Sequence, residues 1–283
     1  LKKSDCVSKN ETQSLFLRST DRFRTKKCAN GSHKPRANSP GKDRKMEENA
    51  SIKALREAID RSRYMVFFGG AGVSTESGIP DFRTPSGLYN QPGAYPPETI
   101  LSHSFFEKHP EIFFDFYRKK MIHPTAKPNA AHQKLAQLEA KGKLKAIITQ
   151  NIDGLHAPAQ EVLELHGSVH RNHCVRCGRA YALADILASE GVPRCSCGGI
   201  IKPDVVLYEE GLNENTIDKS AHYISSAEIL IIGGTSLAVY PAAGLVTYFR
   251  GRHLVVINKT PTPADRRADL VIHGPIGEIF SQL

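Results

Sequence analysis

The chain has 283 residues, of which 40% are hydrophobic and 24% charged, and this composition excludes collagen, a wholly disordered chain and a small disulfide-bonded protein. Its length allows one large domain or two small ones. The formal net charge of +9 is uneven, since 13 of the 38 Lys and Arg but only 4 of the 29 Asp and Glu lie in residues 1–45. The binding to nucleic acid or membrane that a basic protein suggests therefore concerns this segment alone.

Residues 1–45 are expected to be a basic, disordered tail. They are rich in Lys, Arg, Ser and Asn, and their one apolar patch, Leu15 to Leu17, is too small to offset the entropy of ordering them. Met46 leads directly into a helical pattern, so we expect it to be the natural start, preceded by a non-native leader. The alternative is a genuine tail that binds nucleic acid or directs nuclear import. We expect no signal peptide, because the start lacks an apolar core segment.

From Met46 on, short apolar strands alternate with helices, and this pattern predicts an α/β fold with a parallel sheet. The predicted helices cover residues 50–62, parts of 104–120, 129–141 and 241–250. The predicted strands cover residues 64–68, 146–149, 228–232, 254–258 and 269–272. Cysteines and glycines interrupt the alternation over residues 168–210, which indicates a module inserted between strands.

A glycine loop, residues 69–74 (GGAGVS), follows the first predicted strand. In a dinucleotide-binding βαβ unit this order brings backbone amides and a helix N-terminus to a pyrophosphate. Thr75 breaks the strict G-x-G-x-x-G pattern, and a tight structural turn stays open as the alternative.

Polar residues 150–153 (QNID) directly follow the buried strand 146–149, at the carboxyl edge where α/β folds bind ligands. Gln, Asn and Asp are poor core residues, so we expect them to hydrogen-bond ribose hydroxyls or an amide, with helix capping as the alternative. Further along, His166 can titrate near neutral pH and act as a general base, although a structural histidine also fits that position.

Two cysteine pairs, Cys174 with Cys177 and Cys195 with Cys197, predict a structural zinc site. Four thiolates fill a tetrahedral Zn²⁺ and leave no open position for catalysis. Four unrelated thiols are the alternative, and we expect the neighbouring His170 and His173 to be surface residues. Clustered cysteines without a signal peptide favour metal binding in a reducing, cytoplasmic compartment.

Residues 229–249 carry no charge and are long enough to span a bilayer. The GGTS segment 233–236 and Pro241 interrupt this run. We therefore expect a short buried strand, a loop and a helix rather than a membrane span.

Taken together, the motifs resemble the sirtuin family of NAD-dependent protein deacylases, and most closely its bacterial-type deacetylases. The similarity extends from about residue 50 to the end of the chain. It rests, in order, on GAGVS at 70–74, GIPDFR at 78–83, QNID at 150–153, HG at 166–167, the four cysteines, GTS at 234–236 and NK at 258–259.

The resemblance implies a catalytic domain over residues 46–283. Its Rossmann-like, doubly wound core covers about 46–80, 129–167 and 214–283, and a small domain covers about 81–128 and 168–213, with a helical module and the zinc module. It also implies an NAD site with catalytic roles for His166, Asn151 and Asp153. The implied NAD-binding residues are Ala71, Thr75, Phe82, Arg83, Gln150, Asn151, Ile152, Asp153, His166, Thr235, Ser236, Asn258 and Ile276. The implied acyl-lysine site is Val205, Val206, Leu207 and Tyr208, with the substrate backbone added as a strand between these residues and the loop after Ser236.

The implied reaction removes acetyl groups from protein lysine and produces free lysine, nicotinamide and 2′-O-acetyl-ADP-ribose. Two features bear on it. The loop at residues 157–161 is two residues shorter than the corresponding loop of relatives. It borders the nicotinamide side of the implied NAD site, so it can affect NAD binding. Desuccinylating relatives place Tyr and Arg three apart, whereas here Lys120 follows Tyr117, which favours a plain deacetylase with an apolar acyl tunnel.

Two other functions stay open at this stage. The first is transfer of ADP-ribose from NAD to a protein side chain in the same pocket. The second is a non-enzymatic zinc ribbon that binds nucleic acid, for which Arg171, Arg176, Arg179 and Arg194 supply only a thin basic stripe.

Overall fold

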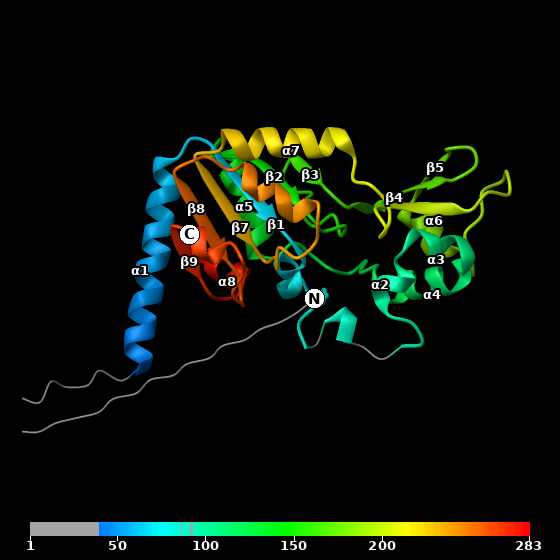
Figure 1. Ribbon diagram of the computed structural model, residues 1–283, viewed down its shortest axis with the longest axis horizontal. Helices are drawn as coiled ribbons and strands as arrows, with labels where there is room; N and C mark the ends of the chain where they lie inside the picture. The colour runs from blue at the N-terminus through cyan, green and yellow to red at the C-terminus, as the bar shows by residue number, and fades with distance from the viewer. Residues whose placement is uncertain (1–39, 86, 91–92) are drawn as a thin grey trace, which may run out of the picture. The chain divides into compact units, whose positions relative to one another are not determined.

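The main sheet has six parallel strands in the order β3-β2-β1-β7-β8-β9 (Figure 1). The computed structural model describes residues 40–85, 87–90 and 93–283. The strands are β1 (Met65–Gly69), β2 (Leu144–Thr149), β3 (Val162–Glu164), β7 (Ile229–Gly233), β8 (His253–Ile257) and β9 (Leu270–Ile272). The order is that of a doubly wound fold, in which the chain starts in the middle of the sheet and extends it in both directions. The predicted α/β class and parallel sheet are confirmed.

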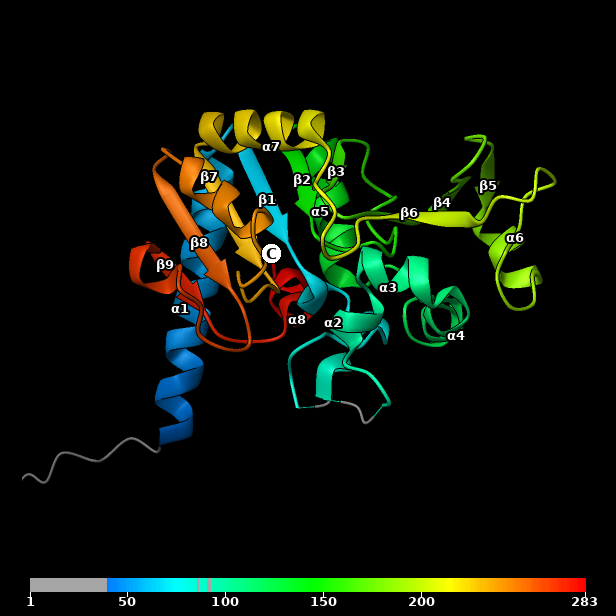
Figure 2. The same ribbon diagram turned by 45° about the vertical axis from the view of Figure 1, so that its right-hand side comes forward.

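Both faces of the sheet are buried, which explains why its strands are continuous apolar runs. In β1, Met65 and Phe67 belong to the core under α1 (Pro40–Arg61), α5 (Ala130–Ala140) and α8 (Ile276–Ser281). Val66 and Phe68 belong to the core under α7 (Glu214–Ser226) and the 3₁₀ helix η4 (Ala242–Tyr248). Figure 2 shows α7 on the side of the sheet opposite α8. Among the described residues, no helix is both long and apolar enough to cross a membrane.

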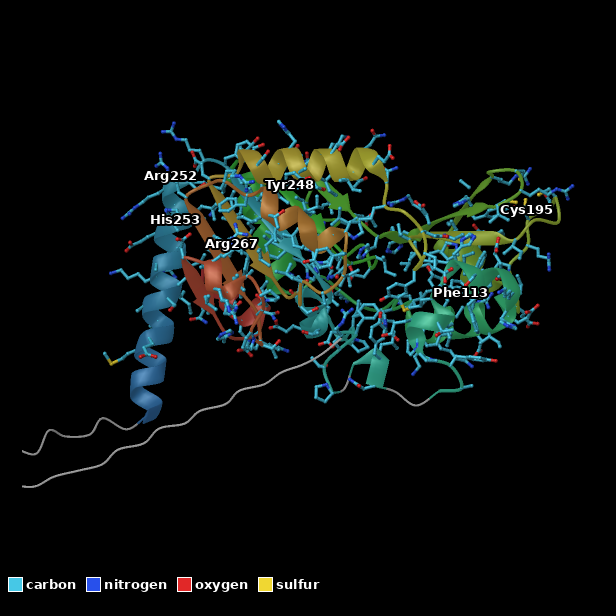
Figure 3. All side chains as sticks on the ribbon, in the orientation of Figure 1. Phe113, Cys195, Tyr248, Arg252, His253 and Arg267 are labelled. Atoms are coloured by element: carbon cyan, nitrogen blue, oxygen red, sulfur yellow. The ribbon has the colours of Figure 1, made fainter. Side chains whose placement is uncertain are left out.

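The inserted module is a three-stranded antiparallel sheet of β4 (Gly167–Cys174), β5 (Ala180–Ala182) and β6 (Ile201–Val205), with α6 (Leu183–Ala188). Three short helices, α2 (Pro97–Ile100), α3 (His103–Lys108) and α4 (Pro110–Lys120), lie beside it in both views (Figures 1 and 2). Phe113 and Phe114 of α4 share one core with Val169 and Ile201 of the small sheet. The helices and the small sheet therefore support each other through a single hydrophobic cluster, to which Phe113 contributes (Figure 3).

Three sequence predictions need correction. Helix α1 begins at Pro40, so residues 40–45 belong to a helix and not to a disordered tail, and Pro40–Leu283 form one compact unit. The prediction for residues 1–39 lies outside the described residues. The predicted helix 241–250 is a 3₁₀ helix, and β3 was not predicted because three residues show no periodicity.

Leu135 provides a test of the core on the α5 face. It is completely buried in α5, so Leu135→Ala is expected to lower the free energy of unfolding by about 2–5 kcal/mol. Leu187→Ala is a matched control, because Leu187 also lies in a helix but is 44% exposed, and a change within about 0.5 kcal/mol is expected. Urea denaturation of both variants measures the difference, and equal losses would contradict the assigned packing.

Candidate active site

Two glycine segments meet at the carboxyl ends of β1 and β7. The N–H of Gly72 donates to the carbonyl of Gly234 at 2.8 Å, and the N–H of Gly70 donates to the carbonyl of Gly233 at 3.3 Å. A Cβ atom on Gly72 would lie only 2.8 Å from the Cα and O of Gly234. The two loops can approach this closely only because both carry glycine, and they meet at the point where strand order reverses, which is where doubly wound folds bind ligands.

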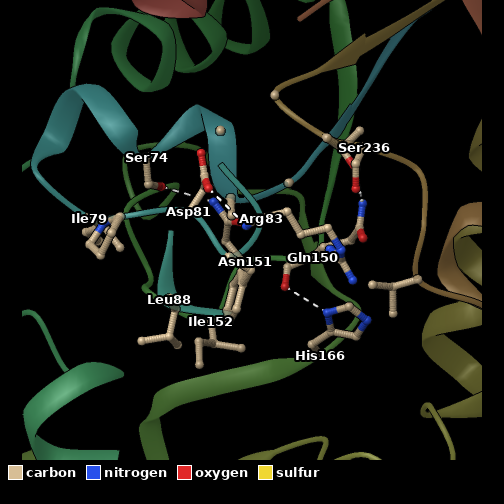
Figure 4. Close-up of a pocket in the computed structure, with 18 of the residues that line it drawn as sticks. Ser74, Ile79, Asp81, Arg83, Leu88, Gln150, Asn151, Ile152, His166 and Ser236 are labelled. Atoms are coloured by element: carbon tan, nitrogen blue, oxygen red, sulfur yellow. Dashed lines mark hydrogen bonds between the residues drawn. The ribbon is translucent and has the colours of Figure 1, made fainter. Parts of the chain in front are cut away.

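A cavity of about 510 Å³ opens at this point (Figure 4). Every cofactor- and substrate-binding candidate from the sequence lines it. These are Ala71, Thr75, Phe82, Arg83, Gln150, Asn151, Ile152, Asp153, His166, Val205, Val206, Leu207, Tyr208, Thr235, Ser236, Asn258 and Ile276. Segments from both halves of the main sheet and from the edge of the small sheet therefore share one wall.

A hydrogen-bond network connects the glycine loop to the polar loop 150–153. Ser74 Oγ donates to the Asp153 carboxylate at 2.7 Å and accepts from Asn151 Nδ2 at 3.0 Å. Gln150 Nε2 donates to Thr235 Oγ1 at 3.0 Å, which ties the polar loop to the segment after β7. These contacts orient the amide and carboxylate groups at the centre of the cavity.

His166 has one ring nitrogen occupied by the protein. Its Nδ1 lies 2.9 Å from the Gln150 carbonyl, which only accepts, so Nδ1 carries the proton and Nε2 keeps its lone pair (Figure 4). Burial lowers the pKa of His166 below its usual 6.5, although the bond to the Gln150 carbonyl acts in the opposite direction. At neutral pH the ring is therefore uncharged and able to accept a proton.

The next residue, Gly167, fixes where His166 stands. It adopts a left-handed conformation with φ of 75°, and a Cβ atom there would lie 1.9 Å from the Asp204 carbonyl oxygen. Glycine is thus required where the chain leaves the main sheet for β4. The Val206 N–H donates to the His166 carbonyl at 3.0 Å, so a backbone hydrogen bond joins His166 to the substrate candidates.

The amides of residues 206–208 are already engaged within the protein. Those of Val206, Leu207 and Tyr208 donate to the carbonyl of His166, the carboxylate of Glu210 and the carbonyl of Leu101. On this side a bound peptide can therefore pair only through carbonyl oxygens. The expected addition of the substrate backbone as a strand stays a prediction.

The four cysteine sulfurs form a cluster in which all ligand atoms lie within 4.8 Å of one another. Sγ of Cys174 is 3.4 Å from Sγ of Cys197, and Sγ of Cys177 is 3.6 Å from Sγ of Cys195. Tetrahedral zinc with Zn–S bonds of about 2.3 Å requires sulfurs roughly 3.8 Å apart, so the residues fit this ion. Cys195 lies in the inserted module, away from the main sheet (Figure 3). The cluster is thus a structural site separate from the cavity.

Residues 70–241 match the sequence profile of the Sir2 family. The chain belongs to this family. The NAD-dependent protein deacetylase of Clostridium perfringens is 59% identical over 238 residues, covering 82% of this chain and 98% of the relative. That of Clostridium acetobutylicum is 57% identical over 235 residues, covering 81% and 96%.

A solved structure of a Sir2 protein with a deacetylated p53 peptide and 3′-O-acetyl-ADP-ribose superposes with a TM-score of 0.75 at 39% identity, covering 82% of this chain and 96% of that one. Together these likenesses establish that this Sir2 family member is an NAD-dependent protein deacetylase with NAD as its co-substrate. Its cysteine cluster is consistent with structural zinc.

The shortened loop of this Sir2 protein is anchored from outside the cavity. The N–H groups of Gln160 and Glu161 donate to the two carboxylate oxygens of Glu139 in α5, at 2.7 and 2.8 Å. Residues 157–161, all of which the structure describes, are not part of the wall of the 510 Å³ cavity, and Ala157, Ala159 and Gln160 instead line a second cavity behind Asn151 and Asp153. Any influence of the loop on NAD therefore has to pass through the polar loop.

Tyr117 and Lys120 do not act together as the acyl-gripping pair of desuccinylating relatives. Tyr117 is 1% exposed and stacks on Phe113 with ring centres 5.6 Å apart, so it belongs to the hydrophobic core. Lys120 and Met121 line the cavity. The preference for an acetyl group over an acidic acyl group stays a prediction, because Tyr117 lies outside the cavity wall while Lys120 lies in it.

The basic stripe on the zinc module is engaged within the protein. Arg171 forms ion pairs with Glu164 and Asp204 at 2.7 and 3.0 Å. Arg176, Arg179 and Arg194 donate to Cys197 O, Ser196 Oγ and Gly198 O, in the loop that carries the second cysteine pair. These arginines brace the cysteine loop, which weakens the nucleic-acid interpretation.

Three functional positions escaped sequence reasoning. Ser74 and Tyr89 line the cavity, and Glu76 accepts the N–H groups of Gly277 and Glu278 at 2.6 and 3.1 Å, which fixes the start of α8 beside Ile276. Their partners lie far along the chain, so no spacing pattern could identify them.

Zinc binding generates the prediction for this site. Cys174→Ser removes one of four ligands, and we expect zinc content to fall well below one ion per chain and amides of residues 167–205 to lose protection from hydrogen exchange. Metal analysis and exchange mass spectrometry measure both, with Leu187→Ala in the same module as a control that keeps its zinc. Full zinc content in Cys174→Ser would refute the assigned ligand set.

Proposed function

We propose that the chain uses NAD and one water molecule to remove an acetyl group from a protein lysine side chain, and that the products are free lysine, nicotinamide and 2′-O-acetyl-ADP-ribose. The observation that carries this proposal is His166, whose Nε2 lone pair is held in the same cavity as the polar loop and the glycine loop. A related Sir2 structure holds a deacetylated peptide and an acetyl-ADP-ribose, which supports the same reaction class.

The residues present fit NAD. The glycine loop places Ala71 and Thr75 in the cavity wall for the pyrophosphate, with Phe82 and Arg83 in the same wall, while the Gly70 and Gly72 amides hold the loop against Gly233 and Gly234. Asn258 and Ile276 line the same cavity, where Asn258 contacts the adenine ribose and Ile276 the adenine. Gln150, Asn151, Ile152 and Asp153 then hold the nicotinamide ribose and carboxamide, and Thr235 and Ser236 face the phosphates.

NAD supplies the electrophilic ribose carbon that receives the acyl oxygen when nicotinamide leaves. The chain's own contribution is to hold and move a proton. Nε2 of His166 accepts the proton of a ribose hydroxyl, and the Gln150 carbonyl stabilises the resulting imidazolium through Nδ1. Asn151 and Asp153, held by Ser74, keep the carboxamide and ribose in place meanwhile.

The acetyl-lysine enters between Val205 to Tyr208 and the loop after Ser236. Val206, Leu207 and Tyr208 supply apolar walls for its side chain, and its backbone pairs with carbonyl oxygens on this side. Related Sir2 structures contain p53 peptides, which supports acetylated protein segments as substrates. The four cysteines of the described residues are reduced ligand candidates rather than disulfides, which fits a reducing compartment, so we propose a cytoplasmic site of action.

The proposal is tested by incubating the purified chain with an acetyl-lysine peptide, with and without NAD, and following all products by mass spectrometry. Deacetylation that requires NAD and releases nicotinamide and O-acetyl-ADP-ribose together is expected. A mass gain of ADP-ribose on a target protein, without need for acetyl-lysine, would instead indicate ADP-ribosyl transfer.

His166→Ala is expected to lower turnover by about 10²–10⁴-fold, because it removes the base, while leaving zinc content and thermal stability near those of the wild type. His222→Ala is the matched control, since His222 is exposed on α7 outside the cavity. Turnover assays on both variants measure how much of the rate depends on His166. Wild-type turnover in His166→Ala would remove this residue from the mechanism.

The rate should also depend on pH through His166. Because burial lowers its pKa below 6.5, the neutral base persists to more acidic pH than in a free histidine. We expect kcat/KM to be constant at neutral pH and to fall as pH drops through a midpoint below 6.5, as measured by initial rates. A midpoint above 6.5 would contradict the assigned environment.

A further inference from the structure

A hydrogen bond between two tyrosine hydroxyls connects the two sides of the cavity. Tyr89 follows the glycine loop, in a segment that we call the flap, residues 81–85 and 87–90. Tyr208 ends the acyl-lysine segment 205–208. Their hydroxyls are hydrogen-bonded across 119 positions of sequence, and both residues line the cavity. We propose that Tyr89 and Tyr208 are positioning residues that couple binding of NAD to binding of the acetylated peptide. The proposal rests on the proposed function of this cavity.

Tyr89 is fixed to the part of the flap assigned to NAD. Its ring meets that of Phe82 edge-on with centres 5.4 Å apart, and the Arg83 guanidinium carbon lies 5.4 Å from its ring centre. Its N–H donates to the Phe82 carbonyl at 2.9 Å. A ligand that orders Phe82 and Arg83 must therefore also order the Tyr89 ring.

Tyr208 is held from the opposite side of the cavity by its backbone. Its N–H donates to the Leu101 carbonyl, and its carbonyl accepts from the His103 N–H, both at 3.0 Å. Glu209 follows in a left-handed conformation with φ of 77°, which is unfavourable for a residue with a side chain. Its carboxylate accepts from the N–H and Oγ of Ser104 and keeps it there. The Tyr208 hydroxyl is thus presented from a rigid support.

The two tyrosines can link the two sides of the cavity because Tyr89 is held by the flap and Tyr208 by the backbone on the opposite side. Burial and then the bond to Tyr208 raise the pKa of Tyr89, so the Tyr89 hydroxyl keeps its proton at neutral pH. When NAD orders Phe82 and Arg83, the Tyr89 hydroxyl is positioned to bond with Tyr208. When a peptide orders Tyr208, the Tyr208 hydroxyl is positioned to bond with Tyr89. Coupling of this kind is reciprocal, since each ligand must raise the affinity for the other by the same factor.

The experiment measures binding without turnover. ADP-ribose lacks nicotinamide and cannot react, so its affinity is determined by calorimetry with and without a saturating acetyl-lysine peptide, and the ratio of the two affinities is the coupling factor. One hydrogen bond predicts that Tyr89→Phe and Tyr208→Phe each reduce this factor by about 3- to 10-fold. Because both variants remove the same bond, the double variant should reduce it no further than either single one.

Tyr248→Phe is the matched control, because Tyr248 is 51% exposed on η4, outside the cavity wall (Figure 3), and its coupling factor should equal that of the wild type. Phe keeps the ring contacts with Phe82 and Arg83, and thermal melting confirms that each variant is folded. A wild-type factor of one, an unchanged factor in either single variant, or additive losses in the double variant would each overturn the proposal.

The deacetylation assay on the wild-type chain separates the two proposals. Deacetylation with an unchanged coupling factor in the variants would refute the tyrosine link alone. Loss of coupling in the variants of a chain that binds both ligands but yields no deacetylated peptide would refute the proposed reaction and leave the link intact.

Discussion

The close approach of two backbones between β1 and β7 is the constraint on which the rest of the site depends. Gly72 and Gly234 pack within hydrogen-bond distance, and a Cβ on either would collide with the other segment. This contact brings the glycine loop over the switch point of the sheet. Ser74 then reaches Asn151 and Asp153, and Gln150 reaches Thr235. A cavity wall assembled from three strand ends thus follows from the absence of side chains at two positions.

The inserted module has a different foundation. Its sheet is small and antiparallel, and it obtains a core only by sharing one with helices α2 to α4 and by holding two cysteine pairs together. Because the four sulfurs fill a metal's coordination sphere, the module can present Val205 to Tyr208 rigidly without taking part in chemistry. The junction at Gly167 transmits that rigidity to His166, whose carbonyl and ring are both hydrogen-bonded. The cysteine cluster and His166 are therefore separate in space but joined through the backbone of β4.

The protonation state of His166, the proposed base, depends on tertiary context. A histidine in water is partly protonated near pH 6.5, whereas His166 is buried and donates through Nδ1 to a fixed carbonyl. Burial keeps the ring neutral, and the hydrogen bond from Nδ1 leaves Nε2 as the free nitrogen. Both come from Gln150 and the cavity wall, so the same residue in an open loop would have neither property.

The sequence by itself determined the α/β class, the positions of five of the six strands of the main sheet and the cysteine cluster. These depend on local patterns, namely apolar runs and cysteines at short spacing. Polar groups after a buried strand indicated residues 150–153, and the resemblance to sirtuins implied most of the other cavity residues. Only the tertiary structure decided that Ser74 bonds Asn151 and Asp153, that Tyr89 lines the cavity and that Glu76 holds the start of α8. It also decided that the amides of Val206 to Tyr208 are occupied and that helix α1 starts at Pro40. The physical reason is that these features are contacts between residues distant in sequence, or helix extension without a periodic signal, and neither leaves a mark on local spacing.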